Sequence, residues 1–354
     1  MVVYFWHAGA AGRGGGGAGA GGGAERARLI GIGSDGLGNQ LNYFISMGIL
    51  SATLGLECGF HFDMETYSGT EGPETFIRLP RVCHDEVRDG FNVSSGEPQP
   101  PREAVRFTSS LRDRFEYRWK PLVKRDLFFQ GKDVVMHKHY NFCGVAGLVK
   151  LAEMDPREFW ERYVALAGQL EPVPGIAERL AELQLGDGGV CAHVRGRKAE
   201  VTAGRLEDNQ VLDHLHALVT KFPGRFKKVY VASMFDVGDR LTAEVSAIRV
   251  RTNTTISVAG TEYSKLRRSM LLSVVDMFAL SQCSVVLLRE DLVRGTFGTL
   301  AAGIGDFKQC PDLAASIGID PDLVMCKEGP GPSVFINEQR CIRTCRCWSP
   351  GVCI

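Results

Sequence analysis

The sequence has no excess of charge of either sign, because 41 Lys and Arg residues balance 41 Asp and Glu residues among 354 positions. A balanced chain has no general attraction for nucleic acid or for an anionic membrane. We therefore expect no nucleic-acid partner, and any anion site must be local.

Long apolar segments are also missing. Residues 1–6 are apolar but far too short to span a bilayer, and they lack the charged region and the apolar core of a signal peptide. Residues 9–24 are almost entirely Gly and Ala, so we expect the segment 1–25 to be disordered. The sequence predicts no membrane segment.

Histidine is missing near the cysteines at the end of the sequence. Eleven cysteines are present in total, and the last four form the pattern C-x3-C-x-C-x5-C from Cys341 to Cys353 with no histidine nearby. Zinc sites usually show C-x-x-C-like pairs separated by a longer loop. The alternatives for this tail are disulfides, reduced thiols or a metal site.

What the sequence does contain is a regular alternation of apolar strands and amphipathic helices. In the first half, the apolar patterns predict strands at 28–32, 58–62 and 134–136 and helices at 41–54 and 156–169. A glycine loop at 33–38 joins the first strand to the first helix, and Gly55 should end that helix. Residues 68–102 predict surface loops, and Pro172 and Pro174 mark a domain boundary.

The second half repeats this alternation. Helices are predicted at 176–185, 211–221, 236–246 and 270–281 and from 296, and strands at 190–194, 228–232, 248–251 and 285–288. We therefore predict an α/β protein with two Rossmann-like domains, 26–172 and 173–354. Ligands should bind at the carboxyl ends of the parallel strands.

The first candidate motif is G-L-G-N-Q-L at 36–41. Gly36 and Gly38 allow the backbone to approach a ligand, the helix start offers unpaired N–H groups, and Asn39 adds an amide. A tight strand-to-helix turn is the alternative. Gly31, Gly33 and Gly36 also match G-x-G-x-x-G with Asp63 after the second strand, the fingerprint of a dinucleotide-binding oxidoreductase.

The second motif places His193, Arg195, Arg197 and Lys198 at the end of the strand 190–194. A fixed arginine there can neutralise a pyrophosphate leaving group without a metal ion. The alternative is a solvated basic loop beside a core histidine.

The third motif joins Asp276, on the helix 270–281, to Thr296, Phe297 and Gly298 at the start of the last helix. A carboxylate can accept two hydrogen bonds from a purine, and the helix start can bind phosphate. A surface charge and an ordinary N-cap are the alternatives.

Together these motifs resemble those of the GDP-fucose-dependent fucosyltransferases. G-L-G-N-Q-L is similar to the N-terminal motif of that superfamily, H-V-R at 193–195 to its H-x-R motif, and D-x-F-x-L-S-x-C at 276–283 with T-F-G at 296–298 to its C-terminal motif. The tail 341–350 is similar to that of plant α-1,2-fucosyltransferases. The resemblance implies a GT-B fold, in which two Rossmann-like domains face each other across a cleft.

The resemblance also implies the chemistry, an inverting, metal-independent transfer of fucose from GDP-fucose to a glycan or glycoprotein hydroxyl. No cofactor besides this donor is implied. Residues 26–172 would form the acceptor domain and 173–354 the GDP-sugar domain. A Golgi or other secretory compartment is expected, with weak support from two N-x-S/T triplets.

Individual roles follow by position. Arg195 would bind the β-phosphate and stabilise the departing GDP, and His193 and Asp276 would contact the nucleoside. Residues 296–298 would hold phosphate and guanine, and Asn39 would approach the donor sugar or the acceptor.

The chain departs from the family pattern after the H-x-R motif. Gly196 and Lys198 stand where many relatives have Arg and Asp, and Arg197 is the candidate substitute for the missing arginine. Glu200 is our candidate for the general base, with Asp35 and Asp63 as the alternatives. These departures leave a second alternative, a catalytically inactive relative that binds a GDP-sugar.

Overall fold

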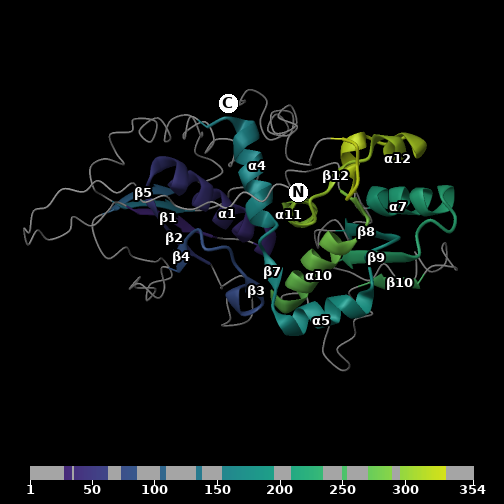
Figure 1. Ribbon diagram of the computed structural model, residues 1–354, viewed down its shortest axis with the longest axis horizontal. Helices are drawn as coiled ribbons and strands as arrows, with labels where there is room; N and C mark the ends of the chain where they lie inside the picture. The colour runs from purple at the N-terminus through teal and green to yellow at the C-terminus, as the bar shows by residue number, and fades with distance from the viewer. Residues whose placement is uncertain are drawn as a thin grey trace, which may run out of the picture.

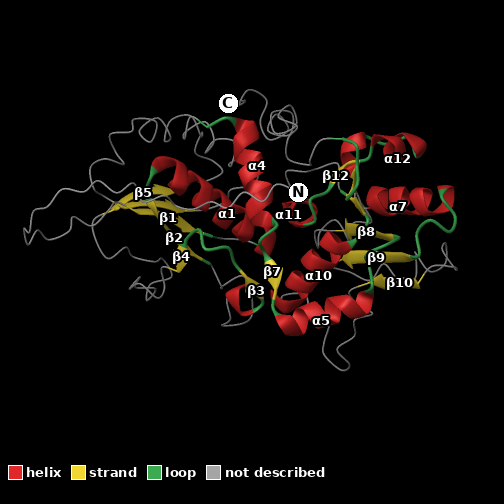
Figure 2. Ribbon diagram, in the orientation of Figure 1, coloured by secondary structure: helices red, strands yellow, loops and turns green. Residues whose placement is uncertain are grey.

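The computed structural model describes residues 28–33, 36–62, 73–85, 104–108, 133–137, 154–194, 209–233, 249–252, 270–288 and 296–331. Two sheets lie on opposite sides of a group of helices that includes α1, α4, α10 and α11 (Figure 1). Most strands therefore lie in these two sheets, and the short strands β3 and β7 form a small third sheet between them (Figure 2). The prediction of an α/β fold is confirmed, and the GT-B arrangement of two Rossmann-like domains stays a prediction.

The first sheet is parallel throughout. Its strands are β1 (Arg28–Ile32), β2 (Glu57–His61), β4 (His84–Asp85), β5 (Ala104–Thr108) and β6 (Asp133–His137). The spatial order is β4-β2-β1-β6-β5, with β1 at the centre. The apolar run in β1 fits this place, because a central strand of a parallel sheet is covered on both faces.

Helix α1 (Leu37–Leu54) follows β1 and packs on the first sheet. Gly55 ends it with a left-handed backbone, φ 69°, and its N–H bonds to the Ala52 carbonyl, as predicted for a glycine cap. Every residue from Gln40 to Ser51 is buried. The helix is therefore covered on all sides, by the first sheet, by other helices and by the turn that contains Val82.

The second sheet is mixed. Its strands are β8 (Gly189–Val194), β9 (Lys228–Ser233), β10 (Arg249–Thr252), β11 (Val285–Leu287), β12 (Lys308–Gln309) and β13 (Val324–Cys326). The order is β10-β9-β8-β11-β13-β12, and the first four strands are parallel. The four strands predicted from the sequence are thus parallel, as expected, whereas the unpredicted strand β13 pairs antiparallel with both β11 and β12.

Helices cover both faces of the second sheet. They are α5 (Pro174–Leu183), α7 (Asn209–Lys221), α10 (Met270–Gln282), α11 (Thr296–Ile304) and α12 (Pro311–Ser316), with a short turn η3 (Pro321–Leu323). Side chains of α5, α10 and α11 share a core with one face, and those of α7 and α12 with the other. Pro174 is the first residue of α5, a position where an N–H group would have no partner within the helix, so a proline fits there.

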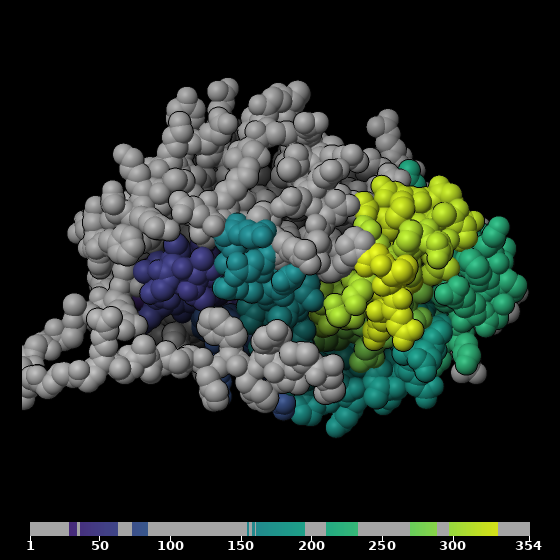
Figure 3. Space-filling view, turned by 45° about the horizontal axis from the view of Figure 1, so that its top comes forward, coloured from purple at the N-terminus to yellow at the C-terminus, as the bar shows by residue number. Residues whose placement is uncertain are grey.

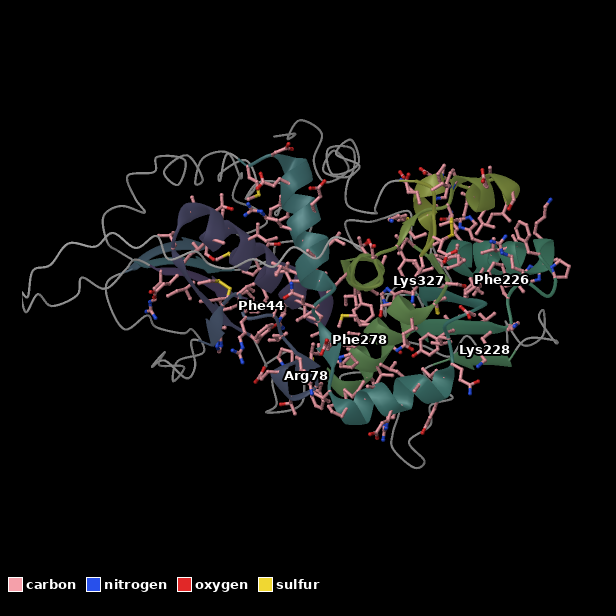
Figure 4. All side chains as sticks on the ribbon, in the orientation of Figure 1. Phe44, Arg78, Phe226, Lys228, Phe278 and Lys327 are labelled. Atoms are coloured by element: carbon pink, nitrogen blue, oxygen red, sulfur yellow. A yellow bond between two sulfur atoms is a disulfide. The ribbon has the colours of Figure 1, made fainter. Side chains whose placement is uncertain are left out.

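A single cluster of buried apolar side chains runs from the first sheet to the second. Helix α1 contacts α4 (Pro156–Ala167), α10 and α11, and Figure 4 labels one cluster member on each side, Phe44 of α1 and Phe278 of α10. In the space-filling view, the teal residues of α4 lie beside the purple residues of the first half (Figure 3). The two halves are thus joined by apolar packing.

Short elements mark the passage between the halves near the predicted boundary at 172/173. The strand β3 (Ile77–Arg78), which follows the turn η1 (Pro73–Thr75), pairs antiparallel with β7 (Glu171–Pro172). Directly afterwards α5 packs on α10. The boundary itself stays a prediction.

Among the described residues, disulfides join three pairs of cysteines: Cys58 with Cys83, Cys191 with Cys283, and Cys310 with Cys326. The four tail cysteines, the segment 1–25 and the predicted helix 236–246 lie outside the described residues. Within the described part of the chain, no helix combines the length and the apolar character needed to cross a bilayer.

Candidate functional site

The candidate site begins at the point where the second sheet reverses its strand order. Strand β8 pairs with β9, which follows it in the chain, on one side and with the later strand β11 on the other. In such sheets ligands bind outside the carboxyl ends of the strands at this point. Strand β8 ends there with His193 and Val194.

His193 meets the start of α11 at this place. Its ring centroid lies 4.9 Å from that of Phe297, with an angle of 41° between the ring planes. A Cβ atom added to Gly298 would lie 3.6 Å from the His193 Cβ atom and 3.9 Å from Nδ1, an ordinary contact distance. The predicted second and third motifs are therefore in direct contact.

The first motif joins them through Gly38, in the first turn of α1. A Cβ atom there would lie only 2.8 Å from the Phe297 Cα atom and 3.1 Å from its backbone nitrogen. Real Cβ atoms essentially never come so close to backbone, so Gly38 permits the approach of the two helices. The first turns of α1 and α11 thus lie against each other, although 259 positions separate Gly38 from Phe297 in the sequence.

Both helices begin without acidic residues in their first turns. The N-cap of α1 is Gly36, which is exposed and provides no side-chain cap, and the first intrahelical bonds run from the N–H groups of Asn39 and Gln40 to its carbonyl. A helix N-terminus carries a partial positive charge and free N–H donors. Two such ends side by side favour an anion such as a diphosphate.

Asp276 lies deeper, in the middle of α10, and is only 9% exposed. The Tyr230 hydroxyl, from β9, donates a hydrogen bond of 2.5 Å to its Oδ1 atom. Burial, and then the charge and hydrogen bond of Asp276, raise the pKa of Tyr230 well above its ordinary value. The tyrosine therefore stays protonated and fixes the carboxylate, and contact of Asp276 with a nucleoside remains a prediction.

Sequence reasoning missed Tyr230. Its only signal is one hydroxyl in the apolar strand K-V-Y-V-A-S, and nothing in that pattern points to Asp276, 46 positions later. The disulfide between Cys191 and Cys283 also went unpredicted. It ties β8, two residues before His193, to the residue after α10.

The predicted site residues lie partly within and partly outside the described residues. Arg195, Arg197 and Glu200 lie outside the described residues, and for Thr296 only the backbone, at the start of α11, is described. Asn39 is half-buried in the first turn of α1. The structure thus brings together Gly36, Gly38, Asn39, His193, Phe297 and Gly298 around two helix starts.

The glycines of the dinucleotide fingerprint have packing roles. A Cβ atom at Gly31 would lie 2.7 Å from the Phe60 ring, and one at Gly33 would lie 3.0 Å from the Gln40 Oε1 atom. Gly31 lies inside β1 rather than in the loop after it. These glycines therefore fit the side chains of the first core closely.

Metal-ligating side chains do not gather in the described part of the chain, where no group of three His, Cys, Asp or Glu residues could hold an ion. The metal-free chemistry implied by the sequence motifs stays a prediction.

Comparison with known proteins gives structural neighbours only. No protein-family model and no curated protein matches the chain. Among solved structures, FUT1 of Arabidopsis thaliana, in a variant bound to GDP, has a TM-score of 0.49 and 15% identity over 80% of this chain and 70% of its own. The NodZ alpha-1,6-fucosyltransferase soaked with GDP-fucose has a TM-score of 0.48 and 13% identity over 80% and 94%.

A third neighbour is POFUT1 in complex with GDP-fucose, with a TM-score of 0.46 and 11% identity over 79% of this chain and 94% of that chain. NodZ, also solved from Bradyrhizobium, is named as a fucosyltransferase, the class that the sequence motifs resemble. All three neighbours have TM-scores below 0.5 and identities of 15% or less.

Proposed function

We propose that this protein is a fucosyltransferase that moves fucose from GDP-fucose to a hydroxyl of a glycan or glycoprotein. The observation that carries the proposal is the convergence of three motifs, distant in sequence, at Gly38, His193 and Phe297. They meet at the carboxyl end of β8 beside two helix starts. A diphosphate that leaves during sugar transfer needs this kind of positive environment.

The proposed reaction is a direct displacement at the anomeric carbon, with inversion and without a metal ion. The acceptor hydroxyl attacks from the side opposite to GDP, the new C–O bond forms as the bond to the β-phosphate oxygen breaks, and the hydroxyl proton passes to a base. Binding both substrates in line supplies much of the rate. Glu200 is the proposed base.

The negative charge that develops on GDP would be stabilised by the N–H groups at the starts of α1 and α11. Arg195 follows directly on the described end of β8 in the sequence and would add a full positive charge. Arg197 would substitute for the arginine missing at position 196. In this proposal the GT-B arrangement places the donor on residues 173–354 and the acceptor on residues 26–172.

Nucleoside recognition would involve Asp276 and His193. The Tyr230 hydroxyl fixes one carboxylate oxygen of Asp276, so the direction of that carboxylate is set before a ligand binds. A pre-oriented carboxylate loses less entropy on binding a guanine than a freely rotating one. The aromatic contact with Phe297 similarly restrains the His193 ring.

We also propose a Golgi or other secretory compartment for this reaction. The support is the three disulfides, because disulfides form and persist in oxidising compartments. Reactivity of the cysteines of the intact protein purified from its native cells toward a thiol reagent, before and after reduction, tests this. If these disulfides are present, reduction should expose six more reactive thiols. If the same six thiols already react before reduction, the proposal is contradicted.

The donor assignment is tested by thermal denaturation with GDP, GDP-fucose, UDP and NAD in the presence of EDTA. A ligand that binds the native state raises the midpoint by mass action. We expect only the two guanosine compounds to raise it, and Arg195→Ala to lose the effect. Stabilisation by NAD alone would instead support the oxidoreductase alternative, which the packing roles of Gly31 and Gly33 disfavour.

Catalysis is tested separately from binding. The expected result is release of GDP from GDP-fucose, by transfer or slow hydrolysis, at a rate that Glu200→Gln lowers without weakening GDP binding. GDP binding with no turnover in the presence of a broad acceptor panel would support the inactive relative, which Gly196 and Lys198 favour.

A further inference from the structure

A buried amide without a described partner lies close to the contact between the two helix starts. Asn42, in α1, is 0% exposed, and among the described residues nothing forms a hydrogen bond with its side-chain Nδ2 or Oδ1 atom. Burying an amide in this way is unfavourable unless something satisfies it. The backbone carbonyl of Asn42, in contrast, has a partner, because it accepts a hydrogen bond of 2.7 Å from the Ser46 hydroxyl.

The position of Asn42 on the helix relates it to the site. It follows Gly38 by one turn, so both residues lie on one face of α1. The sheet lies on another face, where Tyr43 and Phe44 contact the Phe60 ring of β2. Helical side chains lean toward the helix N-terminus, which directs the amide toward the contact of Gly38 with Phe297.

We propose that Asn42 is a positioning residue of the nucleotide site, whose amide binds a buried water molecule linking the first turns of α1 and α11. Buried waters typically form about three hydrogen bonds with polar groups that have no other partner. Asn42 would supply a donor and an acceptor, and a first-turn N–H group of α11 would supply another donor. The water would thereby set the separation of the two helix starts that receive the diphosphate.

The role of Asn42 in nucleotide binding rests on the proposed function, whereas the water-mediated link between the two helix starts does not. Its test compares Asn42→Leu, which keeps the shape and removes the polar atoms, with Asn42→Ser, which can still hold a water. The matched control is Ser46→Ala, one turn further along the same helix, which removes a buried polar group that already has a partner.

The measurements are the thermal midpoint, the GDP dissociation constant and the hydrogen exchange of first-turn amides without ligand. We expect Asn42→Leu to leave the midpoint nearly unchanged, because an apolar side chain of the same shape replaces both the amide and its water. It should weaken GDP binding about tenfold, equivalent to about 1.4 kcal/mol, and speed exchange in both first turns. Asn42→Ser should restore most of the affinity, and Ser46→Ala should leave it unchanged.

Unchanged GDP affinity and unchanged hydrogen exchange in Asn42→Leu would overturn the inference. A lower thermal midpoint in the same variant would then indicate that the amide only stabilises the fold. If the wild type does not bind GDP at all, the proposed function fails instead. Exchange alone then decides on the link: faster exchange in both turns supports it, and unchanged exchange refutes it.

Discussion

The contact between Gly38 and Phe297 allows a prediction whose magnitude follows from the structure. A Cβ atom at position 38 would lie 2.8 Å from the Phe297 Cα atom, whereas favourable carbon–carbon contacts begin at about 3.5 Å. Gly38→Ala therefore requires the two first turns to separate by about 0.7 Å. Both partners are held by helical backbone, so this separation cannot be absorbed by a rotating side chain.

Gly298→Ala is the matched comparison, because it is also a first-turn glycine of the same pair of helices. There the nearest heavy atom would be the Leu288 Cδ2 atom at 3.5 Å, an ordinary contact. Alanine is about 1 kcal/mol more favourable than glycine inside a helix, and this gain is shared by both variants. The difference between them therefore isolates overpacking, which typically costs about 1–3 kcal/mol.

We expect Gly298→Ala to raise the free energy of unfolding by up to about 1 kcal/mol. Gly38→Ala should lie about 1–3 kcal/mol below it and weaken GDP binding as well. Urea denaturation followed by tryptophan fluorescence measures the midpoint of each variant. The two free energies of unfolding are then compared with the same dependence on urea concentration. If Gly38→Ala proves as stable as Gly298→Ala, the close approach of α1 and α11 is wrong.

Three further predictions concern a buried tyrosine, a lysine and a disulfide. Tyr230→Phe should lower the free energy of unfolding by about 1–3 kcal/mol, because it leaves the Asp276 carboxylate without its hydrogen-bond donor. It should also reduce the preference for GDP over IDP in a binding titration, and an unchanged preference would show that Asp276 does not recognise the base. Because the pKa of Tyr230 is raised, the folded state loses stability as pH rises above the ordinary tyrosine value of 10.0, and the variant should flatten this alkaline decline in denaturation curves. Burial lowers the pKa of Lys327, against a smaller opposing effect of Asp187, so stability should rise with pH toward the ordinary lysine value of 10.5, and Lys327→Met should remove that slope. Replacing both Cys191 and Cys283 by alanine should lower the free energy of unfolding by about 2–5 kcal/mol, since their bridge closes a long loop; a loss below about 1 kcal/mol would mean that the bridge does not constrain the unfolded chain.

Local patterns predicted much of the secondary structure. The apolar run at 28–32 became β1, Gly55 ended α1, and the strand at 190–194 placed His193 at a carboxyl end. These features depend on residues a few positions apart, so one short window contains the whole signal. The same holds for the glycines at 36–38, for H-V-R at 193–195 and for T-F-G at 296–298, each of which starts or ends an element, whereas Asp276 lies inside α10.

The elements that were missed are short or depend on distant partners. Strand β13 has three residues and is defined by its pairing with β11 and β12, and β5 is defined by its pairing with β6. The contact of Gly38 with Phe297 likewise has no local signal. The sequence indicated that Gly38 allows a close approach but could not identify another helix as the approaching group.

The burial of α1 on all sides has a consequence for how the protein unfolds. Its residues share one apolar cluster with the first sheet, with α4 and with the helices of the second sheet. Neither half can expose its side of α1 to water without removing packing from the other. We therefore expect the described parts of both halves to melt in a single cooperative transition, and a destabilising change within α1 to be detected equally by probes placed in either sheet.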